Sequence, residues 1–90
     1  MTIQQQVIED HRALGRDELA TAIELIVDQW GRAEGPARWD AAQRLTGLMT
    51  LWSIREGVRS YRARHRFVSL DACGELSIRS LRRSRPKKGS

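Results

Sequence analysis

The residues of this chain with the clearest chemical potential are a run of arginines in its second half. Four of them follow one another at spacings of four, three and four residues, and a fifth lies between the last two: Arg55, Arg59, Arg62 and Arg66, with Arg64. At about 100° per residue, this spacing places the four along one face of a helix. Guanidinium groups are planar forks that match phosphate oxygens, and a row of them can displace counterions from a nucleic acid. We therefore expect this arginine stripe to bind a polyanion.

The distribution of charge supports the same kind of partner. Residues 1–54 carry five arginines against eight acidic residues, a net charge of −3, whereas residues 55–90 carry eleven basic residues against three acidic ones, a net charge of +8. The two parts sum to +5. The last nine residues hold five of the basic groups: Arg82, Arg83, Arg85, Lys87 and Lys88. This asymmetry indicates a polyanionic ligand for the basic half, and we expect residues 82–90 to form a disordered basic tail.

Two aromatic residues, Tyr61 and Phe67, interleave with the basic run and could stack on bases. Sequence-specific reading of DNA is less well supported. The segment after Pro36 begins with small and apolar residues rather than the polar side chains of a recognition helix, and neither zinc-finger spacing nor an RNA-recognition signature is present. The sequence therefore predicts sequence-tolerant binding of DNA or RNA.

Metal binding and catalysis find little support in the remaining residues. His11, His65 and Cys73 do not share the short spacing that zinc ligands require, so we expect neither a metal site nor a cofactor. We find no glycine-rich phosphate loop and no nucleophile motif, and we expect a protein that is not an enzyme. We expect Cys73 to be a small buried apolar side chain.

The same composition bears on location and origin. A single cysteine permits no internal disulfide and suits a reducing compartment. No apolar run approaches the ~18 residues of a membrane span, and the first residues do not resemble a signal peptide. We expect a cytoplasmic protein that does not interact with membranes, and the preference for Arg over Lys indicates a bacterial or phage origin.

Helical periodicity organises the first half of the chain. We expect an amphipathic helix from Thr2 to Leu14, capped by Thr2 and ended by a left-handed Gly15. A second helix is predicted from Arg16 to Trp30, where apolar residues recur at helical spacing and Asp17 is the expected N-cap.

The central segment is predicted to be a long helix over residues 36–64, begun by Pro36. Gly47 lies among large apolar residues, which indicates close approach of a neighbouring helix. Gly57 lies where the apolar half becomes basic, so a break there is the alternative to one continuous helix. The residues expected to anchor the core or a dimer interface are Trp30, Trp39, Leu45, Leu48 and Trp52.

Residues 67–81 fit two structures. Phe67–Leu70 and Leu76–Arg79 alternate as short strands around a turn at Asp71–Glu75, but Ser69 could instead cap a last helix. We favour the helix. The predicted fold is therefore mainly α, with a bundle of three to four helices forming a single domain over residues 1–81.

Two functions fit these features. The first is a small regulatory protein that binds nucleic acid through the arginine stripe and the basic tail. The alternative is an inhibitor or adaptor of the phage or plasmid type, anti-CRISPR-like or anti-activator-like, which docks on a host protein or nucleoprotein complex. Trp, Tyr and Arg dominate the energetics of protein interfaces, which suits the alternative. Because so short a chain buries little surface alone, we expect a homodimer in either case.

Overall fold

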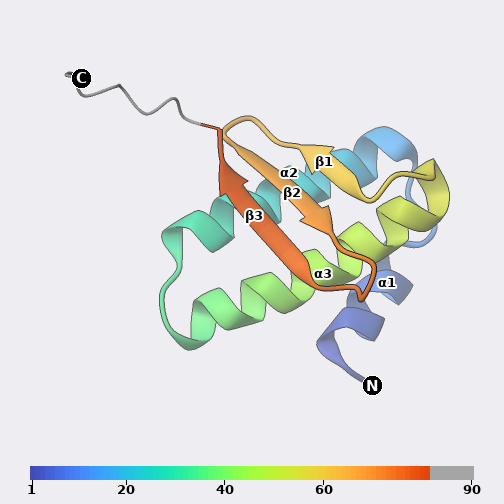
Figure 1. Cartoon of the computed structure of the whole chain (residues 1–90). Coiled ribbons are helices and arrows are strands. Elements are labelled where there is room, and N and C mark those ends of the chain that lie inside the picture. Colours follow the sequence, from blue (N-terminus) through green and yellow to red (C-terminus); the bar gives the residue numbers. More distant parts are fainter. Residues whose placement is uncertain (82–90) are drawn as a thin grey trace.

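The computed structural model describes residues 1–81, which form three helices followed by a three-stranded antiparallel sheet. The elements are α1 (Ile3–His11), α2 (Arg16–Arg32), α3 (Pro36–Glu56), β1 (Ser60–Arg62), β2 (Arg66–Leu70) and β3 (Leu76–Ser80). The strands lie in the order β1-β2-β3, and the sheet covers one side of the helices (Figure 1). A mainly α fold is therefore present, with a sheet added to it. The predicted tail, residues 82–90, lies outside the described residues.

The two N-terminal helices begin with capping interactions. Thr2 accepts a hydrogen bond from the N–H of Gln5 at 3.1 Å, and the side chain of Gln5 accepts one from the N–H of Thr2 at 3.0 Å. This is a complete capping box. Helix α2 begins at Arg16, so its N-cap is Gly15 and the predicted N-cap, Asp17, is wrong. The Glu18 carboxylate accepts the Gly15 N–H at 2.9 Å and so caps the first turn. Gly15 has a φ of −75°, so the left-handed conformation predicted for it is wrong.

The central helix ends at Glu56, and its predicted extension to residue 64 is wrong. Gly57 has a φ of +76° and donates its N–H to the Ser53 carbonyl at 3.0 Å. A left-handed residue with this hydrogen bond is a common helix C-terminus and favours glycine. The break at Gly57, predicted as the alternative, is confirmed.

Residues 67–81 form a hairpin, so the helix that we favoured there is wrong. The Asp71 carboxylate accepts the N–H groups of Cys73 and Glu75, each at 2.8 Å, and Gly74 adopts a φ of +83°. An aspartate that bonds to its own following backbone and a left-handed glycine specify a turn. The alternation of apolar residues on either side of this turn was the better predictor.

The core lies between the sheet and the helices and extends into the contact of α1 with α3. Its fully buried side chains come from α2, α3 and β2: Leu19, Ile23, Leu45, Leu48, Met49 and Val68. Trp52 is also buried, whereas Trp30 is partly exposed. Trp39 is 61% exposed and so lies outside the core, while its alternative role in a dimer interface stays a prediction. Trp39 lies six positions before Leu45, about 120° away around the helix.

Helices α1 and α3 pack closely at Gly47, as its position among large residues predicted. A Cβ atom at this position would lie 2.8 Å from the carbonyl oxygen of Gln4 and 3.3 Å from the Cβ of Val7. The backbone of α1 therefore occupies the space that any side chain at Gly47 would need.

Gly47→Ala is expected to lower the free energy of unfolding by about 1–2 kcal/mol, because overpacking outweighs the gain in helix propensity. Chemical denaturation followed by circular dichroism measures this change. Thr46→Ala is the matched control, because Thr46 is one residue away and only half-buried. This substitution raises helix propensity without introducing a clash. A Gly47→Ala protein as stable as this control would show that α1 does not pack against α3 in this way.

Candidate nucleic-acid interface

The structure distributes the predicted arginine stripe over several elements instead of one helix face. Arg55 lies in the last turn of α3, Arg59 precedes β1, and Arg62 ends β1. Arg64 lies in the turn between β1 and β2, and Arg66 begins β2. The helical arrangement is therefore wrong, because the chain changes at Gly57 from a period of 3.6 residues to the period of two of a strand.

Two arginines of the stripe make contacts that hold the fold together. Arg55 donates a hydrogen bond to the Leu14 carbonyl and so ties the end of α3 to the α1–α2 connection. The guanidinium carbon of Arg66 lies 5.7 Å from the centre of the Trp30 ring, and Arg38 stacks on the same ring at 3.9 Å. Such cation–π contacts join β2 to the end of α2 and the start of α3.

The outward side of the sheet carries a different set of basic residues. Strand register aligns Arg62 with Phe67 and Phe67 with Arg79, so these three side chains form one row across all three strands. A second row beside it contains three serines, Ser60, Ser69 and Ser77. We call these six residues the outer sheet face. Directly opposed side chains lie about 5 Å apart at their Cβ atoms, so Arg62 and Arg79 lie on either side of Phe67.

The opposite side of the sheet is apolar and packs on the helices, which determines the direction of the outer sheet face. Val68 is completely buried, and its cross-strand neighbours Tyr61 and Ile78 pack against the core. Phe67 is the neighbour of Val68 in β2, so its side chain points to the other side of the sheet, and it lies outside this core cluster. Figure 1 shows the helices on one side of the sheet only.

The basic residues of the outer sheet face are available for a ligand. Arg62 and Arg79 are exposed, and within residues 1–81 neither forms an ion pair or a hydrogen bond through its side chain. None of the six positions is acidic, and Glu56, which could have balanced the stripe, pairs with Arg16 at 2.8 Å. The face can therefore present one cation on each side of an aromatic ring.

Arg79 was missing from the residues predicted to bind. It lies thirteen positions beyond Arg66 in the chain, too far for a count along one helix to include it. The strand alternation of Leu76, Ser77, Ile78 and Arg79 was the available signal, because it places Arg79 on the polar side of a hairpin.

Tyr61 does not share this face. Its ring packs edge-on against Trp52, with 5.1 Å between ring centres, and its hydroxyl donates to the Glu24 carboxylate at 2.7 Å. Burial raises the pKa of Tyr61, and the hydrogen bond and charge of Glu24 raise it further, to about 12, while Arg16 acts in the opposite direction. Of the two aromatic residues expected to stack on bases, only Phe67 is in position to do so.

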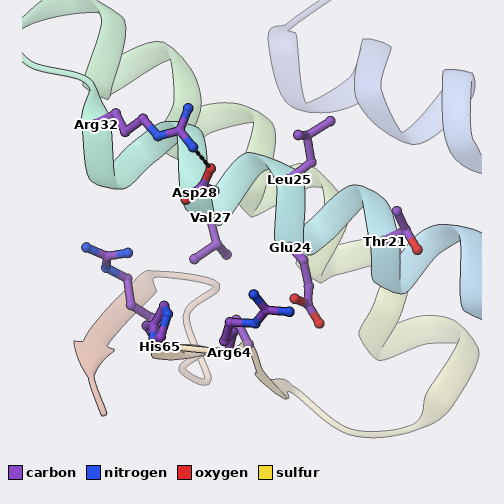
Figure 2. A pocket seen from close by; sticks show the side chains of 10 residues that line it. Thr21, Glu24, Leu25, Val27, Asp28, Arg32, Arg64 and His65 are labelled. Carbon is purple, nitrogen blue, oxygen red and sulfur yellow. Dashed lines mark hydrogen bonds and ion pairs between the residues drawn. The ribbon is translucent and has the colours of Figure 1, made fainter. Parts of the chain in front are cut away.

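A cleft of about 470 Å³ adjoins the interface, between α2 and the β1–β2 turn (Figure 2). Glu24 and Asp28 line it from α2, while Arg64 and His65 line it from the turn. Asp28 pairs with Arg32 one helical turn along. The α2 wall of the cleft therefore holds two carboxylates with Arg32 beside them, and the other wall holds basic side chains.

The remaining predicted site residues separate into two groups. Arg59 is exposed and has no side-chain partner within the described part of the chain. The five basic residues of the tail lie outside the described residues: Arg82, Arg83, Arg85, Lys87 and Lys88.

Other expectations concern cysteine, metals and membranes. Cys73 is exposed in the β2–β3 turn, so its expected burial is wrong. Across residues 1–81, no cluster of three or more His, Cys, Asp or Glu side chains could hold a metal ion, and no helix is long and apolar enough to cross a membrane.

Fold and site together define a small, mainly α protein, with three helices backing a sheet whose outer face is basic and aromatic. Comparison with protein-family models, with curated proteins and with solved structures finds no match to this chain.

The environment of Tyr61 can be measured directly, because it is the only tyrosine in the chain. Its phenolate absorbance should titrate near pH 12 instead of the ordinary 10.0. Since the fold raises this pKa, the stability gained from Tyr61 is present below pH 10 and is lost as the pH rises towards 12.

Glu24→Gln should lower the midpoint of this titration, although not to the ordinary value, because burial persists. Glu34→Gln, in the α2–α3 loop, is the control and should leave it unchanged. A midpoint at the ordinary value in the folded wild-type protein would contradict the contact between Tyr61 and Glu24.

Proposed function

We propose that this chain is a small non-enzymatic protein that binds single-stranded nucleic acid on the outer sheet face. The observation that carries this proposal is the row of Arg62, Phe67 and Arg79, an exposed cation on each side of an aromatic ring. Single-strand binding proteins combine the same two components, an aromatic platform for bases and basic residues for the backbone.

Each component has a defined role. Stacking of a base on an aromatic side chain contributes about 1–3 kcal/mol and tolerates any base, because every base has a π face. Arg62 and Arg79 would contact the phosphates on either side of the stacked base, as guanidinium forks suit phosphate oxygens. The adjacent serine row offers hydroxyl donors and acceptors to the sugars and base edges. Binding of this kind depends little on sequence.

A single strand fits this face better than a duplex. In a duplex the bases are stacked on one another, so Phe67 could not reach a base face without unstacking it. A single strand can splay its bases onto a sheet, which is the usual way in which β-sheet surfaces bind RNA.

The charge outside the row favours the same ligand. Arg64 lies two residues beyond Arg62 and is exposed. The five basic residues of positions 82–90 follow directly after the last described residue, Leu81. Together these groups would attract a polyanion over a larger area than the face itself. A protein of this size would regulate by covering the strand.

A protein partner is the second candidate, and two exposed residues of α3 favour it. Trp39 is 61% exposed and Ile54 is 72% exposed. Exposed tryptophan is a frequent anchor of interfaces, whether the partner is a host protein or a second copy of the chain. Sedimentation of the purified protein detects self-association, and nuclease-treated affinity capture detects a host partner.

The nucleic-acid proposal predicts a large effect of reversing the two arginines of the row. Arg62→Glu with Arg79→Glu should weaken binding of a fluorescent single-stranded oligonucleotide at least a hundredfold, and should make the affinity depend less steeply on salt. Fluorescence anisotropy measured across a salt series tests both expectations. Phe67→Ala should weaken binding about five- to a hundredfold, as loss of one stacked base implies.

The matched control is Arg12→Glu with Arg44→Glu, which changes the net charge equally on the helical side of the molecule. This variant should bind nearly as well as the wild type. Equal losses in both double variants would mean that only net charge matters. Absence of binding by the wild-type protein at low salt would refute the proposal.

A further inference from the structure

The cleft between α2 and the β1–β2 turn has chemistry that the outer sheet face lacks. Its α2 wall contains two carboxylates one helical turn apart, Glu24 and Asp28, and its other wall contains Arg64 and His65. Figure 2 shows the Glu24 side chain directed from α2 toward the turn. The volume of about 470 Å³ lies within the usual range for small-molecule sites, roughly 300–1,000 Å³.

Both carboxylates are held in place and each keeps one oxygen for a ligand. Glu24 accepts the Tyr61 hydroxyl with Oε2, and Asp28 accepts the Arg32 guanidinium with Oδ2. Within residues 1–81, Oε1 of Glu24 and Oδ1 of Asp28 accept no hydrogen bond. The α2 wall therefore offers two hydrogen-bonded carboxylates, each with one oxygen open to a ligand.

The opposite wall does not neutralise these acceptors. The side chains of Arg64 and His65 are exposed and form no ion pair within the described part of the chain. Opposite charges thus face each other across the cleft without closing it. A ligand that suits both walls must present hydrogen-bond donors to α2 and an anion to the turn.

We propose that this cleft binds an unpaired nucleobase that carries an exocyclic amino group, with the adjoining phosphate held by Arg64 and His65. This inference rests on the proposed function and specifies a base preference for it. Arg62 of the outer sheet face ends β1 and Arg64 lies in the turn that follows, so a strand that passes around this turn would reach both the face and the cleft. Carboxylates accept hydrogen bonds from the cytosine amino group, and unpaired bases are commonly read on this edge.

The same geometry favours cytosine over uracil and thymine. These bases present a carbonyl oxygen where cytosine presents its amino group. A carbonyl oxygen that faces a carboxylate oxygen places two acceptors against each other, and the N3–H group of uracil or thymine supplies one donor where the cytosine amino group supplies two. The cleft would therefore distinguish cytosine from uracil, although the stacking platform would not.

Oligocytidylate and oligouridylate of equal length provide the test, because they differ only in the edge that the cleft would read. Fluorescence anisotropy should show the wild-type protein binding oligocytidylate roughly tenfold more tightly. Glu24→Gln with Asp28→Asn should reverse this preference, since each amide can keep its oxygen toward Tyr61 or Arg32 and turn its NH₂ donor toward the uracil carbonyl. Circular dichroism confirms that the variant is folded.

Glu9→Gln with Asp10→Asn on α1 is the matched control, because it changes the net charge equally away from the cleft. This control should retain the preference for cytosine. Equal binding of both oligonucleotides by the wild type, with the loss caused by reversing Arg62 and Arg79 intact, would overturn the cleft inference and leave the proposed function standing.

Persistence of the cytosine preference in the Glu24 and Asp28 double variant would also overturn the inference, since the preference would then arise elsewhere. Failure of the wild type to bind either oligonucleotide would refute the proposed function itself. The two failures are therefore distinguished by the same set of measurements.

Discussion

The contact of Trp52 with β1 determines how the sheet sits on the helices. The indole N–H donates to the Ser60 carbonyl at 3.1 Å, and the ring packs edge-on against Tyr61. Arg59 and Ala63, on either side of β1, form backbone hydrogen bonds with Leu70 and Arg66. In an antiparallel pair only every second residue bonds to the partner strand, so the carbonyl of Ser60 points away from β2. Trp52 satisfies this carbonyl at the free edge of β1. A buried residue of α3 thereby aligns the first strand, and antiparallel pairing aligns the other two.

Alignment of β1 decides which side chains face outward. Tyr61 is drawn inward by Trp52 and Glu24, so its neighbours Ser60 and Arg62 must point to the other side of the sheet. Because Phe67 pairs with Arg62 and Arg79 pairs with Phe67, both side chains point to the same side of the sheet as Arg62. A shift of one residue would bury two arginines and expose Val68, at a large cost in free energy. The basic face is thus a consequence of how the core is packed.

The first half of the chain was predictable because its apolar residues repeat at helical spacing. Gly47 and Pro36 had the roles that their chemistry indicated. The second half misled because arginines spaced at four, three and four residues imitate a helix face, although their long side chains are tolerated in any exposed structure. The local signals that governed it were a left-handed Gly57 and the Asp71 turn. Each of these signals depends on a single residue, so a count of apolar or charged residues at a fixed spacing does not detect it.

Contacts rather than position in the chain distinguish the arginines that hold the fold together from those whose side chains are unpaired within residues 1–81. Arg16, Arg38 and Arg66 each lie against a tryptophan ring, where the guanidinium is held by packing. Within residues 1–81, Arg62 and Arg79 have no such contact and no acidic neighbour on their face. Net charge does not distinguish these arginines from one another. Counting charges therefore identified the basic half of the chain but not the outer sheet face. That surface follows from strand register, and the register follows from the apolar residues on the opposite side of the sheet.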